Sequence, residues 1–293
     1  SQPSIPATGA PAGSGGLGRG GTIRIDVADH EGGDAGALSG GTFSLSASGF
    51  DSDGSAFGSG GTIGIFDTAA AESGSLVLGD LFAEALGFGS ESLGFELVTD
   101  TGRIEVLGTV DIFVDNDASF TGIGDGSLEV GTSLSVRSNG GSIALVQDPG
   151  AMAFLIGARN IQLSAVGAIN GGSAGIFASE DVRAEAGGDV GLGRVEAGDD
   201  ILITGGSATI GFAKTNGEPD EDDGGEGSDD EQFASNLVVE TSGTASVAEA
   251  DVAGDIRLTS ISANVQSSIK LKAGGEVFVD AATHVALVHA EGG

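Results

Sequence analysis

The sequence predicts an all-β fold, a single-stranded, right-handed parallel β-helix (β-solenoid) with a few loop insertions. A cassette of two glycines and a short strand-like segment recurs at equal spacing, at Gly20–Ile25, Gly40–Leu45 and Gly60–Ile65. A fixed period of roughly 20 residues indicates units that bury their apolar faces by stacking on neighbours. Within each cassette apolar residues occupy every second position, which is the periodicity of a β-strand. The paired glycines suit tight corners, since positive φ angles cost little only for glycine. The right-handed sense follows from the general preference of parallel crossovers.

The order of these segments predicts the domain organisation. Residues 1–19 are rich in proline and glycine, which is typical of a flexible lead-in. Strand-like segments recur over residues 20–293, where we expect one β-solenoid. With roughly 20 to 27 residues per coil, about 11 to 14 coils at ~4.8 Å each would form a rod on the order of 60 Å long. Inward positions such as Ile23, Phe43 and Ile63 are expected to stack in one apolar column.

Two segments interrupt the rhythm and are expected to be insertions. Residues 67–98 include Asp80–Leu86, whose composition predicts a helix of one or two turns with Asp80 near its N-cap. Residues 216–231 contain nine acidic side chains in sixteen positions. Repulsion among these charges favours a solvated loop on the outside of the rod.

Composition limits the classes of partner and chemistry. The 293 residues carry 43 acidic and 11 basic side chains, a formal net charge of −32, which disfavours nucleic acid and anionic membranes as partners. Divalent cations are the favoured small partners of such a surface. The absence of cysteine excludes disulfides, thiol catalysis and cysteine-based zinc sites. No stretch of about 18 apolar residues occurs, so the sequence predicts no membrane span.

Several acidic motifs are candidate calcium sites, because calcium takes six to eight oxygen ligands. None of them completes the spacing of an EF-hand, and the competing interpretation is that these residues form corners, since aspartate favours turns. Gly198–Leu202 with the following Gly205 and Gly206 is similar to a calcium-binding nonapeptide of a β-roll, but the pattern occurs once. We therefore expect no cofactor, with weak calcium binding as the one alternative. The candidate ligands are Asp51, Asp53, Asp115, Asp117, Asp199, Asp200, Asp222 and Asp223.

Other motifs carry little chemistry. Gly13–Gly18 matches the dinucleotide pattern G-x-G-x-x-G, but a strand-like segment follows it where that fold needs a helix. His30, His284 and His289 are expected to be structural or surface residues, and no spacing marks a catalytic triad. The absence of Trp and Tyr and the few basic residues disfavour a saccharide groove. We therefore expect no enzyme and assign no catalytic residue.

Some segments resemble the central repeats of filamentous-haemagglutinin-like exoproteins and related autotransporter passengers of Gram-negative bacteria. Gly188–Leu192, Gly254–Leu258 and Ser268–Gly275 look like that family's recurring G-D-I-x-L-x-A-x-G phrase, and weaker versions cover most of residues 20–290. The resemblance implies a right-handed parallel β-helix that is exported to the cell surface. No secretion-domain motif of the Asn-Pro type lies near the start, so we expect an internal segment or a separately assembling subunit.

The functional expectation is a non-catalytic extracellular structural or adhesive protein at the bacterial surface, such as an adhesin, fibre, surface-layer or matrix component. Its expected partners are other copies of itself or adjoining repeats, end to end or side by side, and glycans or proteins of a host or cell surface. The alternatives are a glycan-active β-helix enzyme, a polysaccharide lyase or hydrolase, and a calcium-dependent binding module.

Overall fold

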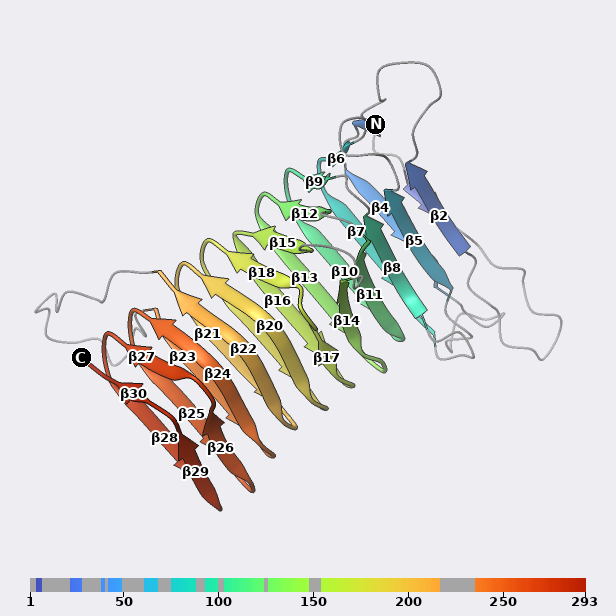
Figure 1. Cartoon of the computed structure of the whole chain (residues 1–293). Coiled ribbons are helices and arrows are strands. Elements are labelled where there is room, and N and C mark those ends of the chain that lie inside the picture. Colours follow the sequence, from blue (N-terminus) through green and yellow to red (C-terminus); the bar gives the residue numbers. More distant parts are fainter. Residues whose placement is uncertain are drawn as a thin grey trace, which may run out of the picture.

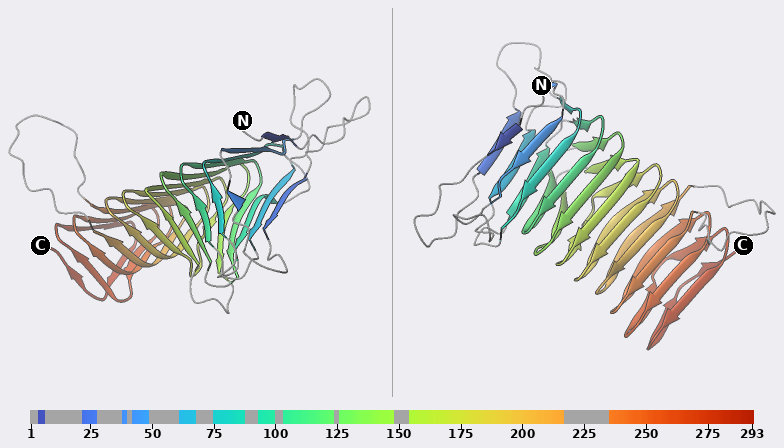
Figure 2. Two further views of the ribbon diagram at one scale, coloured as in Figure 1. Left: turned by 90° about the horizontal axis from the view of Figure 1, so that it is seen from above. Right: turned by 180° about the vertical axis from the view of Figure 1, so that it is seen from behind.

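The computed structural model of the chain is a parallel β-helix, with 30 strands in the residues that it describes (Figure 1). The coils stack into an elongated rod with the N-terminal and C-terminal strands at opposite ends (Figure 2). The expected fold class is thereby confirmed. Within the described residues no helix occurs, and hence none that is long and apolar enough to span a membrane. The structure describes residues 4–6, 22–27, 38–39, 42–48, 61–67, 75–87, 93–99, 103–123, 126–147, 154–216 and 235–293.

Three faces, each a column of parallel strands, enclose one core. The first face is an 11-stranded sheet in which each strand pairs with the strand one coil away. Its strands are β1 (Ser4–Pro6), β4 (Phe43–Ser46), β7 (Leu81–Ala85), β10 (Val110–Val114), β13 (Ser133–Ser138), β16 (Asn160–Ala165), β19 (Val182–Ala186), β21 (Ile201–Gly205), β23 (Leu237–Thr241), β25 (Ile256–Ser260) and β28 (Val277–Ala281).

A 19-stranded sheet forms the second and third faces together, because three long strands bend from one face to the other. The bent strands are β20 (Val190–Ala197), β22 (Ala208–Thr215) and β24 (Ala245–Val252). The second face also contains β2 (Thr22–Val27), β5 (Thr62–Asp67), β8 (Leu93–Thr99), β11 (Asp117–Gly122), β14 (Ile143–Gln147), β17 (Ile169–Asn170), β26 (Asn264–Ser267) and β29 (His284–Leu287). The third face also contains β3 (Leu38–Ser39), β6 (Ser75–Leu78), β9 (Arg103–Val106), β12 (Ser127–Val130), β15 (Leu155–Ala158), β18 (Gly175–Ala178), β27 (Lys270–Ala273) and β30 (Ala290–Glu291).

The core consists of inward side chains that stack in register from coil to coil. On the third face one such column comprises five residues that are each at most 1% exposed, and their strands pair position by position. On the second face the rings of Phe95 and Phe120 lie 5.5 Å apart between centroids. Burying these aliphatic and aromatic groups provides the main stabilisation, about 25 cal/mol per Å² of apolar surface. The third-face column is Ile104, Leu128, Ile156, Ile176 and Val195.

The expectation that Ile23, Phe43 and Ile63 form one column is wrong for Phe43. Ile23 and Ile63 are paired in register on the second face. Phe43 lies on the first face and pairs with Leu81 instead. Consecutive cassettes therefore form two faces of the same coil, and a cassette stacks on the next but one. The same pair of glycines precedes strands of different faces along the sequence, so the sequence repeats by strand and not by coil.

Coil length varies more widely than the spacing of the strand-like segments suggests. Asp181 and Asp200 occupy equivalent corners of adjacent coils and are 19 residues apart. Asp200 and Asn236, the next equivalent pair, are 36 residues apart because the acidic segment lies between them. Extra residues are accommodated at corners, while the strands keep their register.

The helix expected near Asp80 is wrong, because residues 81–85 form strand β7. This strand pairs with β4 and β10, and its side chains alternate between buried and exposed. Strands β6 and β8, from the same expected insertion at 67–98, also pair with neighbouring coils. At the N-terminal end, β1 pairs with β4 although it lies within the expected lead-in. Pairing with adjacent coils outweighed the helix propensity of the Leu-Phe-Ala-Glu-Ala segment.

Candidate functional site

A polar ladder runs along the corner that precedes the first-face strands. In this corner ladder, the Oδ1 atom of each Asn or Asp accepts a hydrogen bond from the backbone N–H of the equivalent residue one coil further along. The acceptor–donor distances run from 2.6 to 3.2 Å. Each bond satisfies a corner amide that the strand ladders leave unpaired. The acceptors in order are Asn160, Asp181, Asp200, Asn236 and Asp255, and the last donor is Glu276.

Three aspartates of this region form the one acidic cluster found among the described residues. One carboxylate oxygen from each of Asp181, Asp199 and Asp200 lies within 4.8 Å of the others. Burial raises the pKa of Asp200, and the charges of Asp199 and Asp181 raise it further, while the hydrogen bond from the backbone N–H of Asn236 lowers it. Carboxylate oxygens so placed are the ligand type that calcium takes. Carboxylates of this cluster also accept backbone hydrogen bonds, so the corner ladder accounts for the cluster without a cation.

The structure thus brings together two of the candidate calcium ligands, Asp199 and Asp200, and adds Asp181, which the sequence analysis did not single out. The signal was present in the Glu180-Asp181-Val182 segment, which has the same acid-before-strand pattern as Asp199-Asp200-Ile201. If both segments are assigned to the same corner of adjacent coils, their acidic side chains are expected to stack on each other.

The candidates Asp115 and Asp117 act as corner caps. Asp115 is buried and accepts hydrogen bonds from the backbone N–H of Gly87 at 2.8 Å and from Asn139 Nδ2 at 3.3 Å. Asp117 Oδ1 accepts from the backbone N–H of Ser142 at 2.7 Å. These bonds tie each corner to the coils beside it, as the corner interpretation of the motif predicts.

The remaining candidate ligands cannot be placed in the same way. Asp51, Asp53, Asp222 and Asp223 lie outside the described residues, as do His30 and the expected acidic loop from residue 217 onward.

A groove lies on the outside of the third face, across strands β9, β12, β15 and β18. Its volume is about 590 Å³, which falls within the usual range of small-molecule sites. Two glycines line the hollow. Gly157 stands between Glu129 and Phe177 in the outward row of the third face, where neighbouring coils carry side chains. Gly131 lies in the adjoining corner, where a Cβ would come within 2.2 Å of the Leu107 carbonyl oxygen. We call this the third-face groove, and its side-chain walls are Glu105, Leu107, Glu129, Arg159 and Phe177.

Ion pairs fix the polar walls of the third-face groove. Arg103 Nη2 lies 3.1 Å from Glu105 Oε1 and 2.7 Å from Glu129 Oε2, so one guanidinium bridges two stacked carboxylates. On the other side Arg159 Nε donates to Glu180 Oε1 at 2.5 Å. This bond raises the pKa of Arg159 and, together with a hydrogen bond from Asn160, lowers the pKa of Glu180. Arg159 and Glu180 therefore both stay ionised at neutral pH.

The apolar wall is held by close packing against glycine. A Cβ added at Gly175 would lie 2.6 Å from Cε2 of Phe177, so the ring occupies the space that a side chain at 175 would take. Arg194 lies on the far side of Phe177, 5.7 Å from the ring centroid. Leu107 is 61% exposed at the opposite edge of the groove. The groove therefore combines a fixed aromatic ring, an exposed aliphatic group and charged groups of both signs.

No protein-family model, no curated protein and no solved structure matches this chain.

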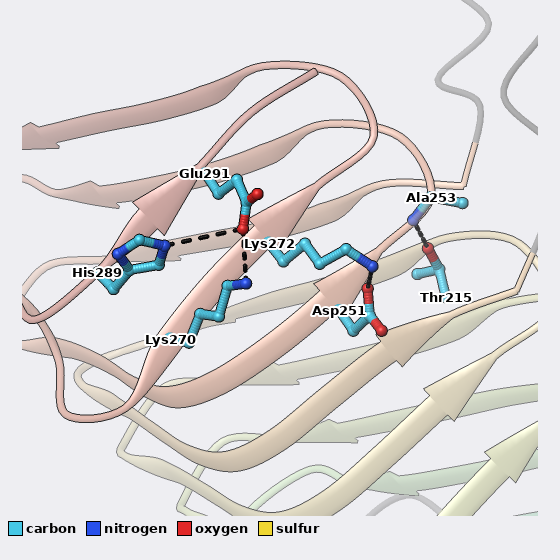
Figure 3. A network of polar contacts seen from close by, with 7 residues as sticks. All are labelled: Thr215, Asp251, Ala253, Lys270, Lys272, His289 and Glu291. Carbon is cyan, nitrogen blue, oxygen red and sulfur yellow. Dashed lines mark hydrogen bonds and ion pairs between the residues drawn. The ribbon is translucent and has the colours of Figure 1, made fainter.

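Nearer the C-terminus, the third face carries further ion pairs that link adjacent coils (Figure 3). Lys270 Nζ lies 2.6 Å from Glu291 Oε2, and Lys272 Nζ lies 2.9 Å from Asp251 Oδ1. The hydrogen bond from Lys270 lowers the pKa of Glu291, and the hydrogen bond to Asp251 raises the pKa of Lys272. His289 lies 3.7 Å from the same Glu291 oxygen (Figure 3). His289 and His284 are both exposed.

Proposed function

We propose that this chain is a non-catalytic structural or adhesive component of a bacterial cell surface, exported to the outside, in which the β-helix serves as a rod. The observation that carries the proposal is the continuous stacking of the three faces, with an 11-stranded first face in unbroken parallel register. Each coil adds to the length of the rod, and each coil is stabilised because its neighbours bury its apolar side chains.

The net charge supports the same role. A net charge of −32 keeps a long β-protein soluble in an external medium. The resemblance of the Gly-Asp-Ile-type segments to repeats of bacterial surface exoproteins supports the location. Partners of such a rod would be further copies or repeats, or molecules displayed on a neighbouring cell.

Two measurements test the proposal together. Negative-stain electron microscopy of the purified chain should show rods roughly 50 Å long, from eleven coils at about 4.8 Å each. Latex beads coated with the chain should adhere to bacterial or host cells more than albumin-coated beads do, or should cross-link into aggregates.

The alternatives give different results. Release of reducing or unsaturated sugars from a polysaccharide panel would replace this proposal with the glycan-active enzyme. Protein found only inside intact cells, protected from added protease, would contradict the surface location.

A further inference from the structure

The third-face groove has the form of a ligand site and not of a packing defect. In the outward row of the third face, Glu105, Glu129 and Phe177 carry side chains and Gly157 between them carries none. A Cβ placed at Gly157 would find Phe177 O as its nearest atom, 4.0 Å away. Packing therefore does not require glycine at this position, unlike Gly131 in the adjoining corner. A side chain could be accommodated at 157, and its absence leaves the centre of the groove open.

The lining suits an amphipathic ligand with hydroxyl groups. The Phe177 ring and Leu107 offer apolar surface against which the C–H face of a sugar ring can pack. The carboxylates of Glu105 and Glu129 lie on adjacent paired strands, and their side chains are 32% and 48% exposed. They can accept hydrogen bonds from hydroxyl groups, and the guanidinium of Arg159, 60% exposed, can donate them. The groove extends across four strands, which together span about 15 Å at ~4.8 Å per coil. This length is enough for more than one sugar ring.

The charge at the groove favours an uncharged ligand. The three carboxylates of Glu105, Glu129 and Glu180 are paired with the two guanidinium groups of Arg103 and Arg159. The groove therefore carries about one negative charge, on a chain whose total is −32. A polyanion would be repelled by the whole rod, and a simple cation would compete with arginines that already neutralise the carboxylates.

We propose that the third-face groove binds a neutral saccharide, with one pyranose ring over Gly157 between Phe177 and Glu129. Leu107 and Arg159 bound the ring at the corner side. The inference rests on the proposed function, because it names the ligand class that an adhesive rod would hold. It departs from the sequence-based argument that a chain without Trp and Tyr lacks a saccharide groove, since Phe177 supplies the aromatic surface.

The test is saturation-transfer-difference NMR of the intact chain with a panel of neutral disaccharides: cellobiose, lactose, mannobiose and N,N′-diacetylchitobiose. At least one sugar should receive saturation from the protein, and a titration should give a dissociation constant. Gly157→Val should weaken binding by more than about tenfold by filling the hollow. Phe177→Leu should weaken it as well, because the aliphatic replacement removes the ring surface.

The matched control is Gly191→Val. Gly191 lies on β20 of the second face, and a Cβ there meets no atom within 4 Å. Both glycine variants should melt at the wild-type temperature, so that a loss of binding confined to Gly157→Val reports on the groove. Equal affinities of wild type and Gly157→Val, or equal losses in both glycine variants, would overturn the assignment.

Failure of this inference can be told apart from failure of the proposed function. No saturation transfer to any disaccharide, with rods and adhesion intact, would remove the saccharide site and leave the adhesive rod. Adhesion that a lysine-rich peptide inhibits and no sugar inhibits would show that the rod adheres through its overall negative charge, and would overturn the saccharide proposal.

Discussion

The backbone N–H of Asn236 donates a hydrogen bond of 2.8 Å to Oδ1 of Asp200, although 36 residues separate the two along the chain. Strands β21 and β23, which follow these residues, pair in full register across that interval. Thr215 Oγ1 also donates to the Ser235 carbonyl oxygen at 2.6 Å, so the residues on either side of the acidic segment lie next to each other. The contacts that define the coil are therefore complete without the intervening acidic segment.

Deleting residues 217–234 and joining the ends with a short Gly/Ser bridge should leave the fold intact. The flanking contacts of Thr215 and Asn236 remain, and the shorter loop costs less closure entropy. Thermal unfolding followed by circular dichroism should show a melting temperature within a few degrees of the wild type. Loss of the cooperative transition would mean that the acidic segment contributes to the folded core.

The substitution Asp200→Asn should stabilise the protein at neutral pH, by up to about 1 kcal/mol. Asparagine keeps the acceptor for the Asn236 N–H and removes a charge that burial and the neighbouring acids disfavour. Because the folded-state pKa of Asp200 is raised, its contribution to stability is present below the unfolded pKa and is lost as the pH rises through the folded value. The difference between variant and wild type should therefore be seen at pH 7 and vanish near pH 3. Chemical denaturation at both values measures it.

A calcium titration of the same pair of proteins gives a separate result. If the cluster of Asp181, Asp199 and Asp200 held calcium tightly, millimolar calcium would raise the melting temperature of the wild type and not of Asp200→Asn. The corner ladder alone predicts no such difference.

Placing an acid inside a coil should be far more harmful than placing it outside. Ile143 and Ile201 are fully buried, so Ile143→Asp or Ile201→Asp would bury an unpaired carboxylate at a cost of several kcal/mol. Ser135 points outward on β13, and Ser135→Asp should change stability by less than about 0.5 kcal/mol. Urea denaturation of the three variants compares them. Similar losses at inward and outward positions would contradict the alternation of the strands.

The corner glycine Gly131 should not tolerate a side chain. A Cβ there would approach the Leu107 carbonyl oxygen to 2.2 Å, so Gly131→Ala forces the two coils apart. We expect a loss of about 1 to 3 kcal/mol in the free energy of unfolding. Gly191→Ala serves as the control, because the added methyl group meets open space. The order of stability, Gly191→Ala above Gly131→Ala, is the outcome to check.

The fold class was predictable because strand alternation and glycine corners are local properties. The stacking order of the strands was not predictable, because similar cassettes belong to different faces. Phe43 and Ile63 are the example, since their cassettes look alike and lie on the first and second faces. The alternation of apolar residues also failed to distinguish corner positions from strand positions. Ile269, in the expected strand-like phrase Ser268–Gly275, is 55% exposed, and the strand begins at Lys270.

The candidate site was predictable only in part. Asp199 and Asp200 stood out as an acidic pair, whereas Asp181 joins them because it occupies the equivalent corner of the preceding coil, 19 positions before Asp200. The third-face groove depends on the stacking of Glu129, Gly157 and Phe177, which belong to three successive coils and lie far apart along the chain. Because coil length varies at the corners, the spacing of residues along the sequence does not show which side chains form such a row.

The three strand ladders of the β-helix have a mechanical consequence. Their hydrogen bonds run along the rod axis, so a pull on the two ends would load the bonds between neighbouring coils in tension. The weakest coil boundary would open first, and the coils behind it would stay folded. Under load the rod would lengthen in steps of one coil, about 18 to 40 residues of released chain each, and would dissipate work before the last contacts break.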